Sequence, residues 1–294
     1  MRKTIFILTI LLTTSSLYCQ TMFSGFIDKY PIELVADISS DGVASAIYAY
    51  SDKDEPIVIT GTLKNRVLTL YEKDAKNNNR AKLTFNKFDS TNSRQEGIWT
   101  DLKTNNELKI TLNKAFEINY GDSVEWKDRE ILQPVSLGNN YFKLIVSKKK
   151  GEFDATVTGV KIVEKKTDKL IQKLKVDCEL IGLNNISIGD FNFDGILDFS
   201  VFEKSYAGPN TSSLYFLYNT KSKKYIDSGF TGVSLEFDNK AKRIYERNQS
   251  RAGSVVTTAE YKVENNKMLL IKERCFKWNE KKQVLIERKL KDCK

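Results

Sequence analysis

The sequence predicts an all-β protein, with an N-terminal β-meander or small barrel-like domain and a C-terminal antiparallel β domain. Two observations carry this prediction. Short segments of alternating apolar and polar residues recur along the chain, separated by Gly, Asn, Asp and Ser turns. No apolar repeat of 3.6 residues is sustained over three helical turns. At 294 residues the chain has room for two domains, each with its own core.

Residues 1–19 have the features of a secretory signal peptide. Arg2 and Lys3 give a charged start, and Ile5 to Leu12 form an apolar segment too short to cross a bilayer. We therefore expect an exported protein, periplasmic or extracellular, cleaved near Cys19. The alternative is a lipoprotein acylated at Cys19, but Tyr18 stands where such a signal needs a small residue. After the signal, no apolar run approaches the ~20 residues of a membrane helix, so no transmembrane segment is expected.

Residues 20–116 are predicted to form the meander domain. Gly61 and Gly97 indicate bends in strands, and Trp99 is interpreted as core filling, with ligand stacking on an open sheet face as the alternative. About eight sequential hairpin-linked strands make either an open curved sheet or a small up-and-down barrel. The predicted strands are 23–27, 32–38, 44–50, 56–63, 67–72, 81–86, 97–101 and 108–113.

The acidic, aromatic-containing stretch 117–137 is predicted to be a junction, and residues 138–294 a second β domain. A hairpin is expected where 157–163 and 169–176 flank the turn 165–168. The other strands expected after Tyr141 are 186–188, 197–203, 214–218, 233–237, 243–246, 257–263, 267–277 and 283–290.

Cysteine content and charge add two expectations. Without Cys19 the chain keeps three cysteines, so we expect Cys275 to pair with Cys293 across a hairpin and Cys178 to stay buried and reduced.

The net charge of +9 falls to +7 once the two cations of the signal leave. Lysines gather at likely turns, where they are solvated or form a patch for anionic glycans, lipid or nucleic acid. No zinc-finger, helix-turn-helix or aromatic RNA-binding pattern is present, so nucleic acid is not an expected partner.

The most specific feature is the run from Asp190 to Asp198, which has the form D-x-N-x-D-G-x-x-D. Calcium takes six to eight oxygens at about 2.3 to 2.6 Å, and a tight loop can supply them from alternating positions. Gly195 permits the sharp turn. The predicted Ca²⁺ ligands are the side chains of Asp190, Asn192, Asp194 and Asp198 and the backbone carbonyl of Ile196.

The loop differs from an EF-hand, because Val201 occupies the twelfth position in place of a bidentate glutamate and the flanking segments have strand patterns. The sequence thus predicts a strand-loop-strand site. The alternative is an Asn/Asp/Gly turn that holds no ion. Three carboxylates within nine residues repel one another, so that alternative requires another source of positive charge.

Catalytic motifs are absent from the sequence. The chain has no histidine, which removes Ser-His-Asp and Cys-His arrangements and most zinc sites, and no phosphate loop or dinucleotide fingerprint occurs. We therefore expect no enzymatic activity. A glycan hydrolase that uses two carboxylates remains an alternative, with Glu125, Asp128 and Glu130 as candidates.

The run I-G-D-F-N-F-D-G-I-L-D-F-S-V-F at 188–202 resembles the calcium loops of FG-GAP and VCBS repeat proteins. It is similar also to single-loop periplasmic calcium-binding proteins of bacteria, in which a hairpin precedes the loop and a Gly/Asn/Ser turn with an aromatic strand follows it. This second resemblance covers about 154–293. It implies a calcium-stabilised β fold related to lysozyme inhibitors that act on peptidoglycan hydrolases. A repeat propeller is not expected, because the loop occurs once. The N-terminal half resembles small exported meander domains of unknown function.

The resemblance implies that the segment 204–213 inserts into a partner's cleft. Its turn residues give it shape, and Tyr206 is an amphipathic anchor of the kind enriched at binding hot spots. We expect Tyr206, Gly208 and Asn210 to contact an envelope protein or glycan, beside the calcium site. The alternatives are an ordinary surface turn and, for the whole protein, a structural or adhesive module of the cell surface.

Overall fold

The computed structural model describes residues 19–293. The predicted signal peptide, apart from Cys19, lies outside these residues. The described chain forms strands throughout, with one short 3-10 helix at Leu290–Asp292, so the predicted all-β class is confirmed. None of its helices is long and apolar enough to span a membrane.

The first eight strands form a closed antiparallel barrel. Each strand pairs with its neighbours in sequence, and the first pairs with the eighth, with Gly25 opposite Leu112. Of the two predicted arrangements, an open sheet or a barrel, the barrel is therefore the one formed. The strands are β1 (Cys19–Ile27), β2 (Tyr30–Ile38), β3 (Val43–Tyr50), β4 (Ile57–Lys64), β5 (Val67–Lys73), β6 (Asn79–Asn86), β7 (Arg94–Asp101) and β8 (Glu107–Glu117).

Side chains fill the barrel interior. Phe23, Tyr48 and Phe85 belong to its buried core, and Trp99 packs against that core, as expected for a core-filling tryptophan. Gly61 lies where two strands approach closely, because a Cβ there would stand 1.8 Å from the carbonyl oxygen of Thr69. The inward-facing positions alternate with outward-facing ones along each strand, as the sequence pattern requires.

The predicted junction 117–137 is in large part a strand, which corrects the sequence-based boundary. Strand β9 (Trp126–Leu137) pairs with β10 along most of its length. Its first half is exposed, whereas Ile131, Leu132 and Gln133 are buried. An edge strand tolerates Pro134 and solvated charges, and these two features gave the segment the appearance of a loop.

Three antiparallel sheets follow the barrel. The first contains β9 to β12, and its β11–β12 hairpin was predicted. The second contains β13 to β16, of which β16 was not predicted, and the third contains β17 to β21. The bounds are β10 (Asn140–Lys148), β11 (Thr156–Glu164), β12 (Leu170–Glu179), β13 (Ile186–Gly189), β14 (Asp198–Ser205), β15 (Thr211–Asn219), β16 (Lys224–Asp227), β17 (Glu236–Asp238), β18 (Arg243–Ser250), β19 (Val255–Glu264), β20 (Lys267–Asn279) and β21 (Val284–Arg288).

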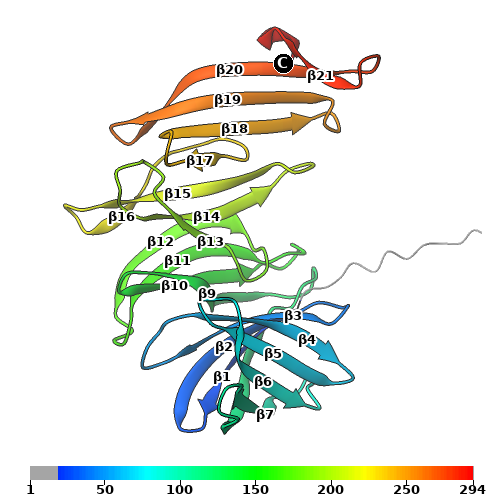
Figure 1. The fold of residues 1–294 in the computed structure, drawn as a ribbon, viewed down its shortest axis with the longest axis vertical. Coiled ribbons are helices and arrows are strands. Elements are labelled where there is room, and N and C mark those ends of the chain that lie inside the picture. The colour runs from blue at the N-terminus through cyan, green and yellow to red at the C-terminus, as the bar shows by residue number, and fades with distance from the viewer. Residues whose placement is uncertain (1–18, 294) are drawn as a thin grey trace, which may run out of the picture.

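Two further cores join these parts in order. The outer wall of the barrel, through Met22, Val35 and Ile47, shares a core with the first and second sheets. A smaller aromatic core joins the second sheet to the third. Figure 1 shows the result as an elongated molecule with the barrel at one end and β18, β19 and β20 toward the other.

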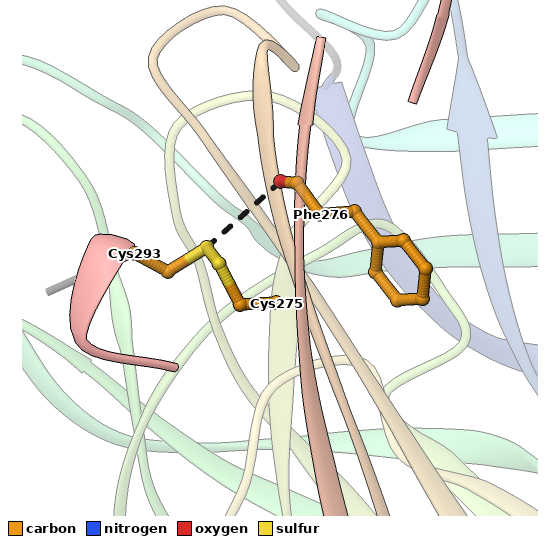
Figure 2. The surroundings of a disulfide bond; sticks show 3 residues. All are labelled: Cys275, Phe276 and Cys293. Atoms are coloured by element: carbon orange, nitrogen blue, oxygen red, sulfur yellow. Dashed lines mark hydrogen bonds between the residues drawn. A yellow bond between two sulfur atoms is a disulfide. The ribbon is translucent and has the colours of Figure 1, made fainter. Parts of the chain in front are cut away.

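The third sheet is the least buried part of the fold. Of the thirteen residues of β20, Cys275 alone is classed as buried. Cys275 is disulfide-bonded to Cys293, and the Sγ of Cys293 lies 3.9 Å from the carbonyl oxygen of Phe276 (Figure 2). The predicted pairing is therefore confirmed, and Cys178 is buried and free, as expected.

We predict that residues 20–117 fold by themselves, because barrel closure gives every strand two partners within this segment. The measurement is the amide spectrum of the fragment in solution, which should be dispersed as in a β protein. A fragment of residues 20–106, which lacks β8, is the matched control and should be disordered or aggregated. A disordered 20–117 fragment would mean that the barrel depends on the core it shares with the first sheet.

Candidate functional site

The loop Asp190–Asp198 connects β13 to β14, as the sequence predicts for a strand-loop-strand site. Gly189 and Asp198 form the last pair of the ladder, so the loop begins where strand pairing ends. Gly195 has φ +87, and an added Cβ there would meet no atom within 4 Å. This glycine is thus required for backbone conformation and not for space.

The polar side chains of the loop turn inward onto its own backbone. The carboxylate of Asp190 accepts hydrogen bonds from the N–H groups of Asp194, at 3.1 Å, and Gly195, at 2.9 Å. Asp194 accepts one from the Ile196 N–H at 2.8 Å, and the amide of Asn192 donates to Asp194 at 2.8 Å. The predicted oxygen donors therefore wrap a single short turn.

Asp198 differs from the other loop carboxylates because it is buried, with 1% of its surface exposed. Its two oxygens accept hydrogen bonds from the N–H groups of Phe191, at 3.0 Å, and Tyr218, at 2.8 Å. Burial, with a smaller contribution from the charges of Asp194 and Asp190, raises the pKa of Asp198 to about 6 against the lowering effect of the two backbone donors. The environment of this carboxylate thus favours either protonation or a nearby cation.

The chemistry of the donors suits a hard cation, since all five predicted ligands supply oxygen. Their arrangement is less complete. Among residues 19–293, no three His, Cys, Asp or Glu side chains form a group that could hold a metal ion. A complete set of calcium ligands would therefore have to combine carboxylates with the side-chain oxygen of Asn192 and the backbone carbonyl of Ile196. Calcium binding by this loop remains a prediction.

The two phenylalanines of the loop were not among the predicted functional residues, yet they connect two sheets. Phe191 packs against Tyr215 of β15 and Phe237 of β17, with ring centroids 5.0 and 4.8 Å apart. Phe193, at φ +63, lies 6.3 Å from Phe237. The strict alternation of phenylalanine with Asp and Asn is the signal that could have indicated this role, because one set of side chains turns inward while the other packs outward.

Two polar contacts add to this connection. The side-chain amide of Asn192 donates to the side-chain oxygen of Asn266, in the β19–β20 turn, at 3.0 Å. The ammonium of Lys242 donates to the carbonyl oxygen of Phe193 at 3.3 Å. Lys242 thus places a positive charge beside the loop. The alternative of a turn without an ion requires such a charge to offset the repulsion among the loop carboxylates.

The predicted partner-binding segment lies away from the loop, which corrects the expectation that the two are adjacent. Asp198 begins β14 and Ser205 ends it, so the loop and the turn after β14 occupy opposite ends of one strand. Eight residues at about 3.3 Å per residue separate Asp198 from Tyr206 by roughly 26 Å.

Within that turn the three predicted contact residues have different roles. Tyr206 and Gly208 are exposed, and the Lys204 ammonium lies 5.2 Å from the Tyr206 ring centroid. Asn210 is 6% exposed, and its side chain bonds to the backbone N–H and carbonyl of Gln249 in β18. Asn210 thus anchors the turn to the third sheet and is not the exposed contact that the sequence predicts.

We predict that calcium raises the melting temperature and that Asp194→Ala abolishes the increase. An ion that binds only the native state stabilises it by about 2.7 kcal/mol at a hundred times its Kd. The measurement is thermal unfolding in calcium, magnesium and chelator, and magnesium should act weakly because it requires a tighter octahedral shell.

Asp238→Ala is the matched control, since Asp238 also accepts bonds from backbone N–H groups in an exposed turn, at Lys240 and Ala241. This variant should keep the full calcium response. Identical melting curves of the unsubstituted chain in calcium and in chelator would refute calcium binding.

Comparison with known proteins adds no family. No protein-family model and no curated protein matches the chain. A Xanthomonas type IV secretion system related protein has 14% identity and a TM-score of 0.37, with 58% of this chain and 98% of that chain covered. The β-propeller domain of the Trilobed protease from Pyrococcus furiosus (10% identity; 92% and 84% covered) and a protein from Lactobacillus plantarum (9%; 92% and 95%) each have a TM-score of 0.23. At these scores the similarities assign neither a family nor an activity.

Proposed function

We propose that the protein is an exported, calcium-binding protein of the cell envelope that binds a macromolecule and has no catalytic role. The observation that carries the proposal is the loop 190–198, in which Asp190 accepts hydrogen bonds from the loop's backbone and the buried carboxylate of Asp198 accepts one from Phe191 N–H. A cation there would offset the repulsion among the carboxylates. Its effect would reach the third sheet through Phe191 and Phe193.

The exposed turn Tyr206–Pro209 is the proposed contact surface. Its base is fixed by the backbone hydrogen bond from Tyr206 N–H to Asn210 C=O at 2.9 Å and by the anchoring of Asn210 on β18. A turn held in one shape loses little entropy on binding, and the exposed tyrosine at its base supplies contact area with few rotatable bonds. These features support binding through a small protruding element.

An envelope protein such as a peptidoglycan hydrolase is the proposed partner, on the strength of the resemblance to lysozyme inhibitors. The charge of this chain narrows the choice. At +7 after loss of Arg2 and Lys3, the protein would be repelled by a cationic lysozyme. The proposed partner is therefore a hydrolase with an acidic or neutral binding surface.

One observation favours a second candidate, a structural or adhesive module. The sheets follow one another along the long axis of the molecule in Figure 1, and calcium at a sheet-to-sheet contact would stiffen such a rod. The carboxylate-based hydrolase gains no comparable support, because Glu125 and Glu130 each pair with a lysine, Lys127 and Lys161.

We predict that Tyr206→Ala reduces capture of the partner from an envelope extract. Tyr30→Ala is the matched control, since Tyr206 and Tyr30 are 42% and 43% exposed and each has a lysine ammonium over its ring, at 5.2 and 5.5 Å. A captured hydrolase whose activity falls on binding supports inhibition, and capture of glycan or matrix supports adhesion. An equal loss of capture in both variants, or a loss in neither, would show that the turn does not bind the partner.

A further inference from the structure

The positive charge of the protein is concentrated in its third sheet. Residues 236–293 contain 15 Lys and Arg against 9 Asp and Glu, a net charge of +6. Residues 19–235 contain 29 of each sign and are neutral. This sheet is also the part with the least burial, so its cations face solvent. A uniform scatter of surface charge would not produce this separation.

Cross-strand register places two of these cations on one face. Arg247 of β18 and Arg274 of β20 both pair with Thr258 of β19. Directly paired residues point to the same side of a sheet, and strands lie about 4.8 Å apart, so the two arginines flank Thr258 with Cα atoms about 10 Å apart. Both are exposed, and neither forms an ion pair within the described chain.

The same face is hollowed into a groove of about 510 Å³. Tyr245, Lys272 and Phe276 line it together with Arg247, Thr258 and Arg274. Phe276 points to the side of β20 opposite the disulfide, as Figure 2 shows. Glu236, Glu246 and Glu260 also line the groove, so its lining combines three cations and three carboxylates with two aromatic rings.

Two of these carboxylates have hydrogen-bond partners other than the groove's arginines. Glu260 accepts a hydrogen bond from Arg243 at 3.2 Å, and Glu246 accepts bonds from the Tyr261 hydroxyl at 2.5 Å and the Val233 N–H at 2.9 Å. Two of the three lining carboxylates are thus already engaged by other groups. Glu260 also lies directly opposite Lys272 in the register, whereas Arg247 and Arg274 both lie opposite Thr258 and face no carboxylate there.

We propose that this groove, which we call the arginine groove after Arg247 and Arg274, binds an acidic polysaccharide, a glycan that carries carboxylate groups. The planar guanidinium of arginine matches a carboxylate with two parallel hydrogen bonds. Tyr245 and Phe276 supply apolar surfaces for the faces of sugar rings. The lining glutamates can accept hydrogen bonds from sugar hydroxyls. The proposal depends on neither calcium nor the turn Tyr206–Pro209.

The test is titration of the intact chain with polygalacturonate oligomers, with neutral dextran and oligo(dT) as comparison ligands. We expect saturable binding of polygalacturonate that weakens as salt rises. The double variant Arg247→Gln/Arg274→Gln should lose roughly tenfold or more in affinity, as expected for charge-assisted hydrogen bonds. Lys281→Gln/Lys282→Gln makes the same charge change in the β20–β21 turn and should lose much less.

If the double variant fails to fold, Arg274→Lys still tests the proposal, because it keeps the charge and removes the bidentate geometry. It should bind several-fold more weakly with an unchanged melting temperature. Absence of polygalacturonate binding, oligo(dT) binding of equal strength, or equal losses in the two double variants would each overturn the proposal.

Discussion

The buried carboxylate of Asp198 is the constraint on which the second half of the structure depends. It accepts backbone hydrogen bonds from Phe191, at the start of the loop, and from Tyr218, at the end of β15, while its own residue begins β14. Three elements are thereby fixed by one side chain. Its negative charge is costly at this depth, as the raised pKa of about 6 indicates. The loop must therefore supply donors or hold a cation.

The consequence reaches the third sheet because the loop also packs against it. Phe191 and Phe193 lie in the aromatic core between the second and third sheets, and few residues of the third sheet itself are buried. A sheet with so little core of its own opens easily unless its contacts are held. The protein has three candidate functional surfaces that lie apart from one another. They are the loop between the sheets, the turn at the other end of β14, and the arginine groove on the third sheet.

Local structure was largely predictable, and long-range contacts were not. Alternation and turn residues locate all eight barrel strands, but closure by β1 and β8 joins segments about 90 residues apart, which periodicity does not report. Strand β9 was missed because its exposed half and Pro134 belong to an edge strand. The role of Asn210 was missed because its partner, Gln249, is distant in sequence. By contrast, the sequence already shows that eight residues separate Asp198 from Tyr206. The rise per residue of a strand alone could have placed these two residues at opposite ends of β14.

Amide hydrogen exchange of the intact chain, in calcium and in chelator, tests the central claim that a cation in the loop holds the third sheet in place. The account predicts faster exchange in chelator for peptides of residues 190–198 and of β17 to β20. Peptides of the barrel, β1 to β8, should exchange at the same rate in both conditions. Unchanged exchange in the third sheet, or an equal increase throughout the barrel, would contradict the account.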